Sequence, residues 1–218
     1  MNPAAVEREI VHVVDDDESL RTVVSRLLRA AGYEVRVYAS AGEFALARNP
    51  DLRGCVLLDV RMPGPSGLDL HAALVREDDP LPVIFLTGHG DIPMSVRAMK
   101  AGAVDFLPKP VHRAELLAAV KVALARDTES RSTRQRLKDL RHRYENLTAR
   151  EREIFARVAA GQPNKQIAAD LEMGERTVKA HRAQVMEKIG AESLAELVHA
   201  ADALSAASSQ GELLPVRA

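Results

Sequence analysis

The chain has 218 residues, 46% of them hydrophobic and 28% charged, a balance typical of a globular protein with one large domain or two smaller ones. The net charge of -1 does not mark a nucleic-acid binder, and the single cysteine, Cys55, excludes an intramolecular disulfide and a cysteine-based metal cluster. No apolar run approaches the roughly 20 residues of a membrane span, and Glu7 and Glu9 stand where a signal peptide would be apolar, so we expect a cytoplasmic protein.

From Ile10 to Leu107, short apolar runs alternate with segments of helical period, which is typical of a parallel sheet covered by helices. The predicted strands are residues 10–14, 34–38, 55–58, 83–86 and 104–107. The predicted helices are residues 18–31, 40–48, 66–77, 91–100 and 112–125. The sequence therefore predicts an α/β, doubly wound, five-stranded parallel sheet within a domain of residues 1–125.

A polar stretch follows this domain. Residues 126–136 contain no large apolar side chain, and residues 126–146 hold 7 basic against 4 acidic residues. An apolar seam then returns at 3-4-3 spacing, formed by Leu137, Leu140, Tyr144 and Leu147. We predict a helical linker over residues 126–146, with a flexible solvated connector as the alternative.

The last part of the chain predicts a small all-α domain over residues 147–204. Thr148 and Glu151 form a capping box at the start of its first helix, and Ser193 and Glu196 form a second box. The predicted helices are residues 149–160, 164–171, 175–189 and 194–204. The second and third are joined by a tight turn, which is the spacing of a helix-turn-helix motif. Residues 205–218 are predicted to be a flexible tail.

Polar side chains follow the predicted strands where each strand ends. Asp15 and Asp16 follow the first strand, Asp59 the third and Thr87 the fourth, and Lys109 comes just after the fifth. The carboxyl ends of parallel strands share one edge of the sheet, so we expect these groups to converge there. Converging carboxylates either take up protons or bind a hard cation such as Mg²⁺.

This constellation suits phosphoryl transfer. A magnesium ion held by Asp15 or Asp16, by Asp59 and by the backbone carbonyl near Arg61 would align a phosphoryl group for attack by Asp59. Lys109 and the Thr87 hydroxyl would then contact phosphoryl oxygens. Each signal has a plainer alternative, since Asp17 can be a helix cap and the segments at Thr87 and Lys109 can be simple turns.

The predicted helix at 175–189 has two different faces. Val178, Val185 and Ile189 form a buried stripe, with His181 beside it. The opposite face carries mostly small and basic residues, namely Arg176, Lys179, Ala180, Ala183 and the acidic Glu187, with Arg182 and Gln184 on its flanks. Small side chains permit close approach to a DNA major groove, while Lys and Arg reach guanine or phosphate. A solvated helical bundle is the alternative, because residues 147–218 hold only 9 basic against 10 acidic residues.

The first domain resembles the receiver domains of two-component response regulators over about residues 9–125. The resemblance rests on the segments VVDDD at 13–17, LDVRMPGPSG at 58–67, TGHG at 87–90 and AGAVDFLPKP at 101–110. It implies Asp59 as the phosphoacceptor, Asp15 and Asp16 as the acidic pair, and a cis peptide bond before Pro110. It also implies a switch pair of Thr87 and Phe106, although Phe106 lacks the hydroxyl of the tyrosine found in many relatives.

The second domain resembles the LuxR-type output domain of the NarL/FixJ family over about residues 146–204. The segments LTARERE at 147–153, GQPNKQIA at 161–168, RTVKAHR at 176–182 and KI at 188–189 carry this resemblance. It implies that the helix at 175–189 enters the major groove. Lys179, Ala180 and Ala183 would face base edges, and Thr177, Arg182 and Lys165 the DNA backbone. Ala183 replaces the lysine of some members.

Together the two resemblances imply a transcriptional regulator that is phosphorylated on Asp59 by a partner histidine kinase, binds promoter DNA and dimerises when phosphorylated. Beyond slow self-dephosphorylation, no enzyme activity is expected. The alternatives are a receiver with an RNA- or protein-binding output, a receiver that no longer takes phosphate, and an Mg²⁺-dependent aspartyl-phosphate phosphatase. Such phosphatases have a second aspartate two residues after the nucleophile, where this chain has Arg61.

Overall fold

The computed structural model describes residues 10–48, 52–76, 80–88 and 92–209. The chain divides into two compact units, Met1–Arg131 and Ser132–Ala218. Among the described residues, every helix is either too short or too polar to cross a membrane bilayer.

The first unit is built on a parallel sheet of five strands in the order β2-β1-β3-β4-β5. The strands are β1 (Ile10–Val14), β2 (Glu34–Tyr38), β3 (Cys55–Asp59), β4 (Val83–Thr87) and β5 (Asp105–Pro108). All residues of β1, β3 and β4 are buried, as their apolar sequences predict. The predicted fold class is thus confirmed, although Val104 precedes β5 and donates its N–H to the carbonyl of Val83 at 2.7 Å.

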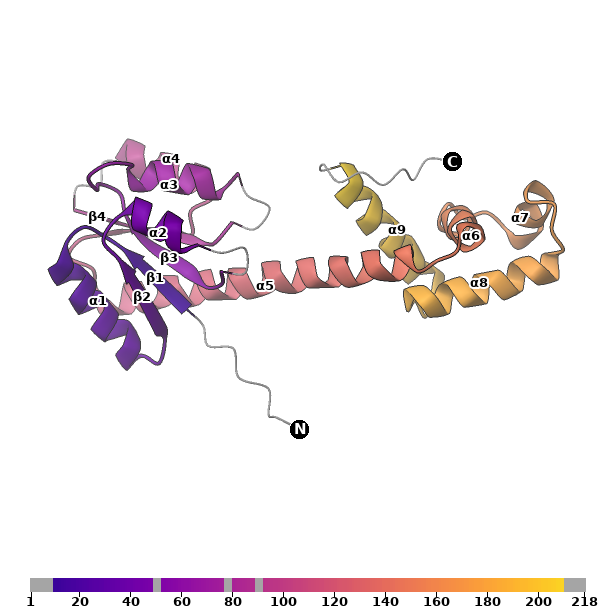
Figure 1. Ribbon diagram of the computed structural model, residues 1–218, viewed down its shortest axis with the longest axis horizontal. Helices are drawn as coiled ribbons and strands as arrows, with labels where there is room; N and C mark the ends of the chain where they lie inside the picture. Colours follow the sequence, from indigo (N-terminus) through magenta and orange to yellow (C-terminus); the bar gives the residue numbers. More distant parts are fainter. Residues whose placement is uncertain (1–9, 49–51, 77–79, 89–91, 210–218) are drawn as a thin grey trace. The chain divides into compact units, whose positions relative to one another are not determined.

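Helices cover both faces of this sheet (Figure 1). They are α1 (Glu18–Ala30), α2 (Ala41–Ala47), α3 (Gly67–Leu74), α4 (Ile92–Lys100) and the first part of α5 (Arg113–Glu145). Leu28 of α1 and Leu116 of α5 pack into one apolar layer with Leu57 of β3. Phe44 of α2, Leu70 of α3 and Ala98 of α4 belong to the layer on the other face. Residues 77 and 91, at the ends of two predicted helices, lie outside the described residues.

The fifth helix and the predicted linker form one continuous helix, α5, of 33 residues. The segment is rich in Arg, Ala and Leu, which favour helices, and contains neither glycine nor proline, so nothing in it terminates the helix. Asp127, which lies in the polar first part of the predicted helical linker, is 7% exposed. Its carboxylate accepts the N–H of Gly54 at 3.0 Å and lies 3.5 Å from Nε of Arg131. Burial raises the pKa of Asp127, and the Gly54 N–H opposes this effect.

A buried histidine lies within β1. Nε2 of His12 is 3.1 Å from the carbonyl oxygen of Arg53, which can only accept a hydrogen bond, so Nε2 carries the ring proton. Nδ1 therefore accepts from the Tyr38 hydroxyl, 3.2 Å away. Burial is the main cause that lowers the pKa of His12 below its usual 6.5. The neutral imidazole thus makes one hydrogen bond with the Arg53 carbonyl and one with the Tyr38 hydroxyl.

We expect the free energy of unfolding to fall as the pH drops below 6.5, because the unfolded chain then takes up a proton at His12 that the folded chain does not. The slope for this group should approach about 1.4 kcal/mol per pH unit until the pH passes its lower folded-state pKa. Chemical denaturation of the full chain across this range is the measurement. His12→Gln should flatten the slope, whereas His112→Gln, at an exposed position, should not. An equal slope in wild type and His12→Gln would contradict this expectation.

The second unit combines the end of α5 with α6 (Ala149–Ala159), α7 (Asn164–Asp170), α8 (Glu175–Ile189) and α9 (Leu194–Ser209). The capping box at Thr148 and Glu151 is confirmed. The tail prediction was wrong for residues 205–209, which continue α9, since this run of alanine and serine contains no glycine or proline to end the helix. Residues 210–218 lie outside the described residues.

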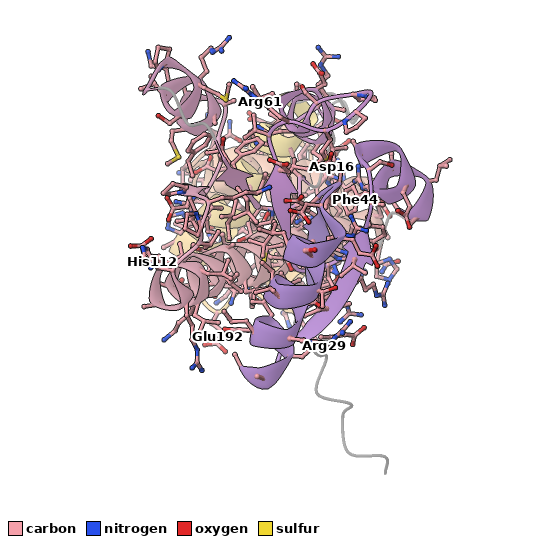
Figure 2. All side chains as sticks on the ribbon, turned by 90° about the vertical axis from the view of Figure 1, so that its left-hand side faces the viewer. Asp16, Arg29, Phe44, Arg61, His112 and Glu192 are labelled. Atoms are coloured by element: carbon pink, nitrogen blue, oxygen red, sulfur yellow. The ribbon has the colours of Figure 1, made fainter. Side chains whose placement is uncertain are left out.

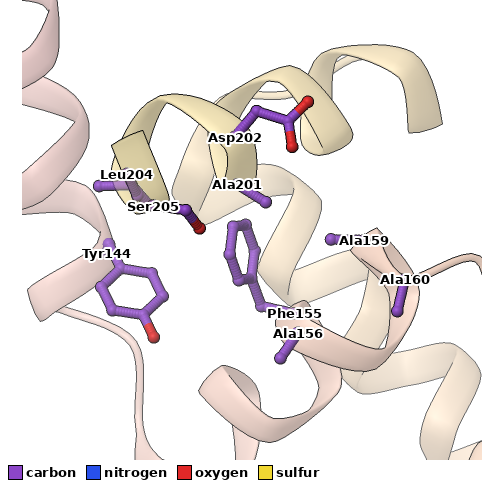
Figure 3. A pocket seen from close by; sticks show the side chains of 9 residues that line it. All are labelled: Tyr144, Phe155, Ala156, Ala159, Ala160, Ala201, Asp202, Leu204 and Ser205. Atoms are coloured by element: carbon purple, nitrogen blue, oxygen red, sulfur yellow. The ribbon is translucent and has the colours of Figure 1, made fainter. Parts of the chain in front are cut away.

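The last turn of α5 is part of this second core. Tyr144 and Leu147 are buried in it, and the Tyr144 and Phe155 rings meet edge to face with centroids 5.3 Å apart. Tyr144 of α5, Phe155 of α6 and Ala201 of α9 line a cavity of about 230 Å³ (Figure 3). The predicted apolar seam therefore packs, in its second half, against the helices of its own chain.

Candidate functional site

The acidic residues gather where the strand order of the sheet reverses. β1 lies between β2 and β3, so the chain leaves β1 on one side and returns through β3 on the other, which opens a crevice at their carboxyl ends. Asp15 and Asp59 are 0% and 7% exposed there, and Asp16 is exposed. One carboxylate oxygen from each of the three lies within 4.8 Å of the others. Figure 2 shows Asp16 and Arg61 at this end of the sheet and Arg29 at the opposite end.

Lys109 bridges two of these carboxylates. Its Nζ lies 2.6 Å from Oδ2 of Asp15 and 3.0 Å from Oδ2 of Asp59. Burial opposes the charge of Lys109, but the hydrogen bonds and charges of the two carboxylates together raise its pKa. Burial also raises the pKa of Asp15, and the Lys109 hydrogen bond works against this rise. The peptide bond between Lys109 and Pro110 is cis, as the resemblance implied.

Neighbouring groups fix the backbone around the carboxylates. Asp17 caps α1, accepting the N–H groups of Ser19 at 2.8 Å and Leu20 at 3.2 Å, so the cap interpretation is confirmed for this residue. Arg21 of α1 donates to the backbone oxygen of Asp15 at 2.6 Å. This contact could not be predicted from the sequence, because it depends on how the Arg21 side chain folds back over the strand end.

Beyond β3, the chain turns tightly against Asp59. The N–H of Arg61 lies 3.4 Å from Oδ1 of Asp59, and the Gly67 N–H donates to the carbonyl of Val60 at 3.0 Å. A Cβ at Gly67 would lie 2.0 Å from the carbonyl oxygen of Asp59, closer than real atoms approach. Glycine is therefore required at the start of α3, which packs directly on the strand end that carries Asp59.

The predicted switch residues lie on the next two strands. Thr87, 2% exposed, ends β4 one residue beyond Leu86, the register partner of Asp59. Its carbonyl accepts the N–H of Lys109 at 2.7 Å. Phe106 of β5 is half-buried, with its ring centroid 6.1 Å from that of Phe85. His89 and Gly90 of the quoted TGHG segment lie outside the described residues.

In the second unit, α7 and α8 form the predicted helix-turn-helix. Val178, Val185 and Ile189 of α8 are buried, as predicted. The candidate DNA-binding residues Lys165, Arg176, Thr177, Lys179, Ala180 and Ala183 are exposed. Arg182 is half-buried, and its Nη1 donates to Oδ1 of Asn164 at 3.2 Å. Arg182 thus joins the start of α7 to α8, a role for Asn164 that the sequence did not suggest.

Comparison with known proteins agrees with both units. Residues 11–121 match the response regulator receiver domain, and residues 145–201 match the bacterial regulatory proteins of the luxR family. The chain belongs to the two-component response regulators that join a receiver domain to a LuxR-type helix-turn-helix domain. It is a phosphorylation-activated, DNA-binding transcriptional regulator.

Full-length relatives support this assignment. Nodulation protein W of Bradyrhizobium diazoefficiens is 45% identical over 95% of this chain and 92% of that protein. Transcriptional regulatory protein FixJ of Azorhizobium caulinodans is 44% identical over 88% of this chain and 90% of that protein. The solved structure of response regulator StyR is 45% identical, with a TM-score of 0.79, and the match covers 89% of this chain and 98% of that chain.

Proposed function

We propose that Asp59 accepts the phosphoryl group from a partner histidine kinase, and that this modification controls binding of promoter DNA by α8. The observation that carries the first part is the placement of the Asp59 carboxylate, at the sheet's reversal point between two further aspartates and the ammonium of Lys109. The receiver function would belong to residues 1–125, the DNA-binding function to residues 147–204 and the connecting role to residues 126–146.

The charges at the site fit a divalent cation. Three carboxylates face one ammonium, which leaves an excess of negative charge that oxygen-preferring Mg²⁺ would balance. Asp15, Asp16, Asp59 and the backbone carbonyl of Arg61 are the groups we assign to hold it. When bound, Mg²⁺ would supply charge neutralisation for the incoming phosphoryl group.

The chain's own residues then have separate tasks. A carboxylate oxygen of Asp59 forms a bond to phosphorus while the bond from phosphorus to the kinase histidine breaks. Lys109, whose Nζ already lies 3.0 Å from Oδ2 of Asp59, donates to one phosphoryl oxygen, and the Thr87 hydroxyl to another. Slow self-dephosphorylation by water is the only reaction that we expect to follow.

Thr87 and Phe106 are proposed as the switch pair. Movement of Thr87 toward the phosphoryl group vacates space near Phe106, whose phenyl ring offers no hydroxyl and can respond only by repacking. Phe106 packs against Phe85 and borders the surface of α4 and β5. We propose that this surface pairs two phosphorylated copies of the chain.

In the DNA-bound form, α8 would lie in the major groove. Lys179, Ala180 and Ala183 are assigned to base edges. Arg176 is assigned to the groove face, and Lys165, Thr177 and Arg182 to the DNA backbone. The exposure of these side chains supports the assignment for all of them except Arg182, which is half-buried and whose guanidinium donates a hydrogen bond to Asn164.

Selection of bound duplexes from a random pool, with and without acetyl phosphate, tests this function. A distinct sequence should be enriched more strongly by the phosphorylated protein. Lys179→Ala should then relax the sequence preference, whereas Arg182→Ala should weaken binding to all sequences and lower the salt slope by about 1. Asn164→Ala serves as the control, since it breaks the internal contact and leaves the arginine charge in place.

Enrichment of RNA in place of duplex DNA, or no enrichment in either state, would contradict the proposed function. Equal losses on selected and random duplexes for both Lys179→Ala and Arg182→Ala would contradict the assigned groove geometry alone.

A further inference from the structure

The carboxyl-terminal end of α8 is held by a residue from outside the helix-turn-helix. Nη1 of Arg143, in the last turn of α5, donates to the carbonyl oxygen of Ile189 at 3.0 Å. Ile189 is the last residue of α8, and the final carbonyls of a helix have no partner within it. Gly190 follows with φ +76°, and a Cβ there would lie 2.5 Å from Nη1 of Arg143. The glycine therefore both ends the helix and leaves room for the guanidinium.

A second contact holds the same turn of α8. Nζ of Lys188 lies 2.7 Å from both carboxylate oxygens of Glu151, which is 3% exposed in the first turn of α6. Hydrogen bonding to Lys188 is the leading cause that lowers the pKa of Glu151. Glu151 is itself fixed, because it accepts the Thr148 N–H at 2.8 Å in the capping box. The end of α8 is thus tied to α6 and, through Arg143, to α5.

We propose that Arg143 is a positioning residue for DNA reading: by holding the Ile189 carbonyl it sets the rotation and depth at which α8 presents its groove face. The inference rests on the proposed function of α8. Hydrogen bonds to base edges require a fixed helix position, whereas contacts to phosphates depend mostly on charge and tolerate small shifts. Release of one end of α8 should therefore reduce sequence discrimination more than it reduces general affinity.

The test compares Arg143→Met with two matched variants in the full-length protein. The two affinities measured are those for a duplex selected by the wild type and for the unselected random pool. Arg143→Met should reduce the ratio of these affinities about tenfold, because the variant loses one charge-assisted hydrogen bond. Arg143→Lys should restore the ratio to within about threefold, since an ammonium can reach the same carbonyl. Arg136→Met removes the same charge from an exposed position on α5 and should leave the ratio unchanged.

Salt dependence separates this positioning role from a direct phosphate contact. We expect Arg143→Met to keep the wild-type salt slope, because Arg143 is not assigned to a phosphate. An unchanged ratio with a salt slope lower by about 1 would identify Arg143 as a phosphate contact and overturn the proposal. Equal losses on both duplexes would also overturn it. If the wild type itself selects no sequence, the proposed function fails. If the wild type is selective but the ratio of its two affinities is the same in Arg143→Met and Arg143→Lys, only the positioning role of Arg143 is refuted.

Discussion

Replacing Asp59 with asparagine should abolish phosphate incorporation from acetyl phosphate in the presence of Mg²⁺. The amide is a poor nucleophile, and it also removes one of the negative charges that would attract the cation. Intact-protein mass spectrometry should show a phosphate adduct on the wild type and none on Asp59→Asn. A persisting adduct at another residue would refute the assignment of Asp59.

The three consecutive aspartates provide controls for this experiment. Asp17→Asn should retain labelling, because the Asp17 side chain caps α1 and asparagine caps helices about equally well. Asp16→Asn should weaken Mg²⁺ dependence while leaving Asp59 in place, so that labelling recovers at higher Mg²⁺ concentration. Loss of labelling in Asp17→Asn at full Mg²⁺ would mean that the division of roles among these carboxylates is wrong.

Beryllofluoride, which mimics the phosphoryl group, should convert the protein from monomer to dimer. The exposed apolar residues Val96 and Met99 of α4, each 45% exposed, offer a surface for pairing. Two output domains joined in this way would add their contacts on neighbouring half-sites, which compensates for their modest basic charge. Sedimentation velocity with and without the mimic measures the change, and the dimer should bind the selected duplex at least tenfold more tightly, an estimate of avidity.

Paired substitutions on this unit locate the dimer surface. Val96→Asp should keep the protein monomeric in beryllofluoride, because a charge would be buried at the interface. Val23→Asp, at a position on α1 that is 64% exposed, should still dimerise. A modified protein that remains monomeric yet binds DNA as tightly as a dimer would show that activation does not depend on pairing.

The sequence predicted the receiver well because its strands are defined by burial on both faces. Runs such as residues 55–58 and 83–86 are too short for a buried helix and suit strands buried on both faces, and the parallel sheet places the polar residue at the end of each run. Asp59 and Thr87 could thus be assigned to one edge without coordinates. The bridge from Lys109 to two carboxylates could not, since it depends on distances across three strands.

The sequence predicted less well which surface covers an apolar side chain, where that surface could belong to the same domain or to another copy of the chain. Of the apolar residues around α4 and β5, Val104 is 9% exposed and Met94 packs partly into the core, whereas Val96 is 45% exposed. The apolar seam of the linker was predicted from its spacing without a partner surface, and Tyr144 and Leu147 are buried against helices of their own chain. Periodicity identifies an apolar face but carries no information about which surface covers it.

Gly67 extends the proposed phosphorylation site beyond the groups that would do chemistry. Because a single methyl at this position would collide with the Asp59 carbonyl, Gly67→Ala would leave every carboxylate and the lysine in the sequence yet displace the strand end that carries them. A genetic screen for alleles that no longer respond to the signal should therefore recover Gly67→Ala together with substitutions of the aspartates. The Gly67→Ala variant keeps all the acidic residues and the lysine of the site, so inspection of these residues alone would not reveal that the site is displaced.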